Sequence, residues 1–84
     1  MRSENKRMKA YLAANGVKAT PKWIAKGSMK HVWRLWDRRP WTKELAQQLN
    51  ALGFRNWDGG PLGEFSGNGG SFCVFVRGHE EFLS

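Results

Sequence analysis

The chain has 84 residues, with 14 Lys or Arg against 7 Asp or Glu, a formal net charge of +7 and a single cysteine. This length predicts one domain, residues 1–84, and the lone cysteine excludes an internal disulfide and a multi-cysteine metal site, which favours a reducing intracellular compartment. No apolar run approaches the roughly 20 residues of a membrane span, and the N-terminal segment lacks the apolar stretch of a secretory signal. We therefore expect a cytoplasmic protein that does not enter a membrane.

The first predicted elements are a helix and a strand. Ser3 is a candidate N-cap and Asn15-Gly16 a stop signal, which together predict a helix over residues 3–14. Residues 17–24, VKATPKWI, then alternate between apolar and polar side chains, as a half-buried strand does. Pro21 places this strand at a sheet edge or at a bulge, because proline cannot donate to a sheet ladder.

The pattern of residues 30–37, KHVWRLWD, predicts the returning strand of a hairpin. The strand assignment also predicts which of its tryptophans faces the core. Strand alternation puts Trp33 beside leucine on one side and Trp36 beside Arg34 on the other. Trp33 is therefore the expected core residue, and Trp36 the expected binding residue. We expect Trp23 to join Trp33 inside and Trp41 to pack over the first turn of the following helix.

The period changes to helical after Thr42, a candidate N-cap, with leucines at 45, 49 and 52 on one stripe and Gly53 as the stop. A short strand near residues 54–57, FRNW, follows. The glycines of residues 59–70 match no phosphate-binding pattern, and DGG and NGG are hairpin-turn signals, although a mobile loop closing on a partner is the alternative.

The apolar run FCVFV, residues 72–76, predicts a buried strand with Phe72, Val74 and Val76 facing inward and Cys73 as a small core residue. Phe72 and Phe75 are three residues apart and so point to opposite faces, which argues against the aromatic strand of an RNA-recognition motif. The order α-β-β-α-β-β predicts an α+β fold with a small, mostly antiparallel sheet and helices on one face.

The sequence contains few side chains in arrangements typical of a catalytic or metal site. Nucleophilic catalysis needs a cysteine beside a histidine and an orienting group, whereas Cys73 lies inside an apolar strand. No i, i+3 or i, i+4 spacing of a metal site joins His31 or His79 to each other or to Asp58, and Glu80 and Glu81 are only immediate neighbours of His79. We expect a protein that is not an enzyme and that carries no cofactor and no metal.

The positive charge is concentrated in the first half. Residues 1–43 carry a net charge of +10 and residues 44–84 a net charge of −3, as expected of a polyanion-binding face backed by an acidic one. Tryptophans among these cations favour single-stranded nucleic acid, or a nucleoprotein complex, as the partner. The candidate binding residues are Lys6, Lys9, Lys18, Lys22, Lys26, Lys30, Arg34, Trp36, Arg38 and Arg39.

Three phrases, GSMKHVWRLW, LGFRNWDGGPL and FSGNGGSFCVFVRGH, resemble small proteins of tailed bacteriophages and related mobile elements. The resemblance implies a phage-infected bacterial host and carries no residue roles. It also keeps an alternative function open, in which the protein is a phage-type inhibitor that binds a host protein or a CRISPR effector. The same Trp and Arg side chains then form hot spots against an acidic protein surface.

Overall fold

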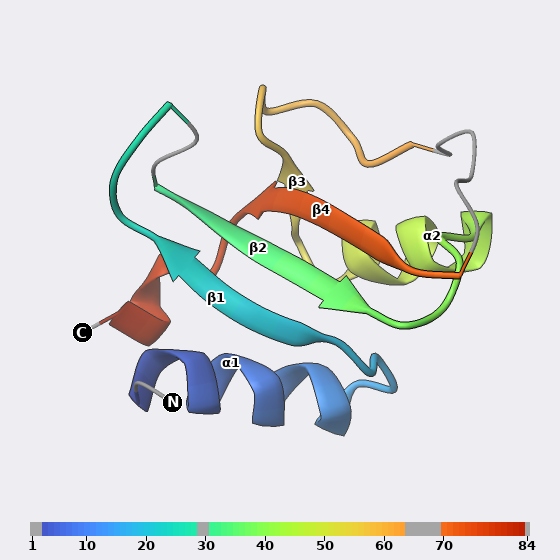
Figure 1. Cartoon of the computed structure of the whole chain (residues 1–84), viewed down its shortest axis with the longest axis horizontal. Helices are drawn as coiled ribbons and strands as arrows, with labels where there is room; N and C mark the ends of the chain where they lie inside the picture. The colour runs from blue at the N-terminus through green and yellow to red at the C-terminus, as the bar shows by residue number, and fades with distance from the viewer. Residues whose placement is uncertain (1–2, 29–30, 64–69, 84) are drawn as a thin grey trace.

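The computed structural model describes residues 3–28, 31–63 and 70–83. Two helices, four strands and a terminal 3-10 helix follow one another as α1 (Ser3–Ala14), β1 (Thr20–Ile24), β2 (Val32–Asp37), α2 (Lys43–Ala51), β3 (Arg55–Asn56), β4 (Phe72–Arg77) and η1 (Glu80–Leu83) (Figure 1). The predicted α+β fold and its order of helices and strands are confirmed.

The strands form one sheet in the order β1-β2-β4-β3, with every neighbouring pair antiparallel. β2 and β4 are therefore the central strands, and β1 and β3 are the edges. Pro21 lies on edge strand β1, as predicted, opposite Leu35 of β2.

The outer edge of β1 is closed to the addition of a further strand. Pro21 has no N–H to offer. The N–H of Trp23, two residues on and pointing to the same side, donates to Oδ1 of Asn5 on α1 at 3.0 Å. The other edge, β3, is two residues long. Because unpaired edge groups are what attract another strand, these features make strand addition at β1 and at β3 unfavourable.

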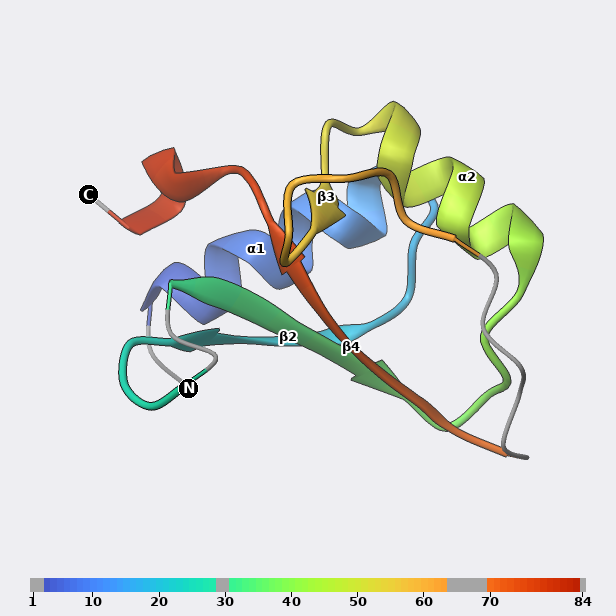
Figure 2. The same cartoon turned by 90° about the horizontal axis from the view of Figure 1, so that it is seen from above.

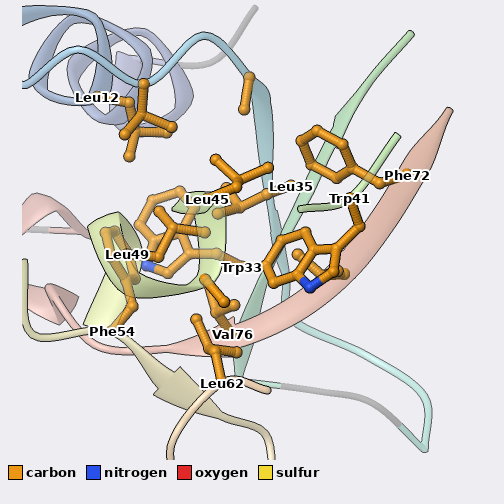
Figure 3. Close-up of a cluster of buried hydrophobic side chains, with 14 of the residues drawn as sticks. Leu12, Trp33, Leu35, Trp41, Leu45, Leu49, Phe54, Leu62, Phe72 and Val76 are labelled. Carbon is orange, nitrogen blue, oxygen red and sulfur yellow. The ribbon is translucent and has the colours of Figure 1, made fainter. Parts of the chain in front are cut away.

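Both helices cover the same face of the sheet, and the opposite face carries no described helix (Figure 2). The core between helices and sheet is filled by large apolar side chains (Figure 3). They come from both helices, from β2 and β4 and from the connecting segments, and include Met8, Leu12, Trp33, Leu35, Trp41, Leu45, Leu49, Phe54, Phe72, Val74 and Val76.

Three tryptophans belong to this side. Trp33 is fully buried, and its indole N–H donates to the carbonyl of Gly78 at 2.9 Å. Trp41 is 8% exposed, donates to the carbonyl of Gly63 at 2.8 Å and meets the Phe72 ring edge-on. Trp23 is half-buried with its ring 5.1 Å from that of Trp33. The predicted core position of Trp33 is confirmed, and Trp23 joins it in part.

The ends of α2 are as the sequence predicts. The hydroxyl of Thr42 accepts the N–H of Leu45 at 3.1 Å, which satisfies one of the free donors of the first turn. Gly53 ends the helix with φ of +93°, a left-handed conformation that glycine adopts without steric cost. Leu45 and Leu49 are buried and Leu52 is half-buried against the same core.

Two expectations about the strands need correction. β1 begins at Thr20 rather than Val17, although Val17 and Ala19 are buried in the preceding extended segment. Cys73 is exposed rather than a core residue, because a sheet with helices on one face leaves alternate residues of β4 facing outward. The predicted DGG turn is formed, with Gly59 at φ of +92°, whereas most of the predicted NGG turn lies outside the described residues.

Candidate functional site

The uncovered side of the sheet gathers side chains from three strands. Side chains of a strand point alternately to the two faces, so the buried set of Pro21, Leu35 and Val74 fixes which of their neighbours point outward. We call these outward positions the open face. They are Thr20, Lys22 and Ile24 of β1, Val32, Arg34 and Trp36 of β2, and Cys73, Phe75 and Arg77 of β4.

The strand register arranges the open face in rows. Arg34 lies opposite Lys22 on one side and opposite Phe75 on the other. Trp36 lies opposite Cys73, so Trp36 and Phe75 are diagonal neighbours. The Cα atoms of such neighbours lie about 7–8 Å apart in a sheet. Both rings are half-buried. The open face therefore carries two aromatic residues at neighbouring positions, and Arg34 is adjacent to both.

Arg34 has no counter-ion among the described residues. Its side chain is half-buried, and its Nε is buried without a hydrogen-bond partner in that part of the chain. None of the other eight positions of the open face is acidic. A partly desolvated cation that has no carboxylate beside it costs free energy, and a nearby anion or hydrogen-bond acceptor would offset that cost.

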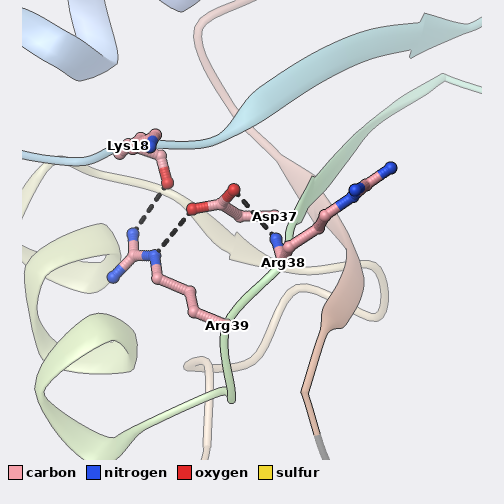
Figure 4. Close-up of polar contacts among 4 residues, drawn as sticks. All are labelled: Lys18, Asp37, Arg38 and Arg39. Carbon is pink, nitrogen blue, oxygen red and sulfur yellow. Dashed lines mark hydrogen bonds and ion pairs between the residues drawn. The ribbon is translucent and has the colours of Figure 1, made fainter.

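The described acidic side chains lie away from the open face. Asp37 is opposite Phe72 and so faces the helix side, where it pairs with Arg39 at 2.9 Å (Figure 4). The N–H of Arg38 donates to its carboxylate, and this bond, with a smaller contribution from Arg39, lowers the pKa of Asp37. The other carboxylates of the described residues belong to the helices, η1 and the turn after β3: Glu4, Glu44, Asp58, Glu80 and Glu81.

The structure divides the predicted binding residues among several places. Lys22, Arg34 and Trp36 come together on the open face, as the strand alternation predicts. Lys26 and Arg38 are exposed beyond the ends of β1 and β2, at the perimeter of the sheet. Lys30 lies outside the described residues.

Three further candidates belong to the helix side or to the edge near it. Lys6 and Lys9 are exposed on α1, which packs on the covered face. Lys9 and Lys18 line a hollow of about 210 Å³ between α1 and the segment leading into β1. The predicted single basic face is therefore split between the two sides of the molecule.

Arg39 is occupied within the protein. Besides its ion pair with Asp37, its guanidinium donates to the carbonyl of Lys18 at 2.7 Å and lies over the ring of Phe72 (Figure 4). These contacts join the end of β2 to the segment before β1. Arg39 thus has a structural role that its place in a basic run does not reveal.

Sequence reasoning missed Phe75 and Arg77 as candidates. Both follow Cys73 in the outward phase of β4, and the alternation of FCVFVR contains that phase, but a continuous apolar run is also typical of a strand buried on both faces. Trp57, 52% exposed in the turn after β3, is likewise not among the predicted residues. Arg55 lies opposite Arg77 yet donates to the carbonyls of Asn50 and Phe54, at the end of α2.

A metal centre is not formed in the part of the chain that the structure describes. There, no three His, Cys, Asp or Glu side chains are grouped so that they could hold a metal ion. Neither of the helices described has the length and apolar character to cross a bilayer. Among known proteins, no family model, curated protein or solved structure matches the chain.

Proposed function

We propose that the protein binds single-stranded nucleic acid on the open face and catalyses no reaction on it. The observation that carries the proposal is the composition of that face, which has three cations, two aromatic rings and no carboxylate on its nine positions. The phage-like phrases of the sequence are compatible with this function but do not support it specifically.

The cations and the rings fit two different parts of a nucleic acid. Lys22 and Arg77 are exposed at the two sides of the open face, where they suit phosphates, and each neutralised phosphate releases condensed counter-ions. Trp36 and Phe75 suit bases, since stacking of a base on an aromatic side chain contributes about 1–3 kcal/mol. Such stacking requires unpaired bases, because a duplex keeps its bases stacked on one another.

The test compares two variants of equal charge. In the first, the open-face cations Lys22, Arg34 and Arg77 are replaced by Gln. In the second, the helix cations Lys6, Lys9 and Lys43, all exposed, are replaced by Gln. Binding to labelled oligothymidylate, oligouridylate and a short duplex is measured by fluorescence anisotropy over a range of salt concentrations, after circular dichroism has shown that both variants are folded.

We expect tighter binding to the single strands than to the duplex. We also expect the open-face variant alone to lose affinity, with its salt dependence on log–log axes reduced by about 0.7 for each phosphate that the variant no longer neutralises. Equal losses in both variants would show that binding depends on net charge rather than on this face. Absence of oligonucleotide binding, with the wild-type protein captured by an acidic partner protein, would favour the inhibitor function instead.

A further inference from the structure

Arg34 is distinguished from the other cations of the open face by its surroundings. It occupies the centre, between Lys22 and Phe75 across the strands and between Val32 and Trp36 along β2. Val32 is 2% exposed although it lies outside the helix-side core cluster. The central position is therefore partly desolvated, whereas Lys22 and the cation at the end of β4 are exposed.

This position suits a base better than a phosphate. On a face that stacks bases on Trp36 and Phe75, the bases lie over the centre and the charged backbone runs along the perimeter, where solvated cations can follow it. A planar guanidinium between two stacked bases meets their edges. It is also the side chain that best matches two neighbouring acceptors, because its N–H donors form a rigid fork.

We propose that Arg34 hydrogen-bonds to the edge of a base stacked beside it and makes the protein prefer guanine within a single strand. The proposal rests on the proposed function, since it names what the same face selects. Guanine offers O6 and N7 as adjacent acceptors for a bidentate arginine. Adenine places an amino donor next to N7, and thymine and uracil place an N–H donor next to O4, so each offers the fork one acceptor on that edge.

Unpaired cytosine is the closest competitor, because its O2 and N3 are also adjacent acceptors. A preference for guanine through N7 is identified with 7-deazaguanine, which keeps the shape and stacking surface of guanine but lacks N7. Oligothymidylates that carry one central guanine, 7-deazaguanine, cytosine or adenine therefore test both the preference and the atom that causes it.

With the wild-type protein we expect one central guanine to tighten binding about 5-fold or more over adenine, the lower limit for a bidentate pair. We expect 7-deazaguanine to remove most of that gain. Equal affinity for all four oligonucleotides, or full affinity for 7-deazaguanine, would overturn the proposal. Both measurements use the unmodified protein, so they do not depend on a variant that folds.

The variant Arg34→Lys keeps the charge and removes the fork, and Arg77→Lys is its matched control at the perimeter. We expect Arg34→Lys to bind unsubstituted oligothymidylate with an unchanged salt dependence and to lose the guanine preference, while Arg77→Lys retains it. A loss in Arg34→Lys that is equal for every sequence and accompanied by a weaker salt dependence would assign Arg34 to a phosphate and overturn the proposal. The proposed function fails separately, if the unsubstituted oligothymidylate does not bind.

Discussion

Both faces of the sheet carry a tryptophan of β2, and these two tryptophans differ in what surrounds them. On the helix side, Trp33 is fully buried and its indole N–H is paired with a carbonyl. On the open face, Trp36 is half-buried beside Arg34, whose Nε has no partner among the described residues. Residues three positions apart on one strand thus have opposite environments.

This contrast shows that residue type alone does not separate a core position from an uncovered position in this aromatic-rich protein. A tryptophan of the helix side stabilises the fold by burying its area and satisfying its N–H. A tryptophan of the open face leaves part of its ring uncovered, and that exposed part is what a ligand can stack on. The side of the sheet decides between the two roles, so the contrast can be tested one side chain at a time.

The largest expected effect is on stability, from Trp33→Ala compared with Trp36→Ala. Trp33→Ala should cost about 3–5 kcal/mol, much of the total of roughly 4–13 kcal/mol typical of a domain this size. Trp36→Ala should cost about 1–2 kcal/mol, since its ring buries only part of its area. Urea denaturation followed by circular dichroism measures both, and equal costs would abolish the proposed distinction between the faces.

A smaller effect is expected from blocking the open face chemically. Cys73 is the single cysteine of the chain, is exposed and lies opposite Trp36. Alkylation with a bulky maleimide should weaken oligonucleotide binding about tenfold, equivalent to the loss of one stacked base, and should leave the fold intact.

The control for this experiment moves the cysteine to the helix side, as Cys73→Ser combined with Gln47→Cys, because Gln47 is exposed on α2. Alkylation there should leave binding unchanged. If the modified control loses as much affinity as modified Cys73, then the ligand does not use the open face. Bound oligonucleotide should also slow the alkylation of Cys73 in the wild-type protein and leave that of the relocated thiol on α2 unchanged.

The smallest expected effect concerns Asp37, which lies at the end of β2 and pairs with Arg39. Its pKa is lowered, mainly by the hydrogen bond from the N–H of Arg38. The ionised carboxylate therefore stabilises the fold at pH values above the ordinary Asp pKa of about 3.9. This contribution is lost as the pH falls through the lower pKa of the folded state. Asp37→Asn should therefore make stability less dependent on pH in this acidic range. Melting temperatures at several pH values measure the change, with Glu80→Gln on η1 as the control; identical profiles for Asp37→Asn and wild type would contradict the expectation.

Much of the fold could be predicted because local signals agree with the tertiary structure. Thr42, the leucine stripe and Gly53 define α2 without reference to any other element. In the hairpin, alternation separated Trp33 from Trp36 correctly, because a strand with one covered face has a period of two whatever packs on it.

The open face as a whole could not be predicted in the same way. The run FCVFV has the composition of a strand covered on both faces, and only the placement of both helices on one side leaves Cys73 and Phe75 outside. The role of Arg39 depends on a carboxylate two residues away and on the distant carbonyl of Lys18. These are relations between segments, which a linear pattern of charges does not contain.

The hydrogen bond from the N–H of Trp23 to Asn5 has a consequence for the dynamics of the protein. An edge-strand amide ordinarily exchanges its hydrogen with solvent through small local openings, but this amide is held by a side chain of α1. Its exchange requires the Asn5 side chain to release it, either by rotating away or by separation of α1 from the sheet. The protection of the Trp23 amide therefore gives a lower limit to the free energy of docking α1 on the sheet.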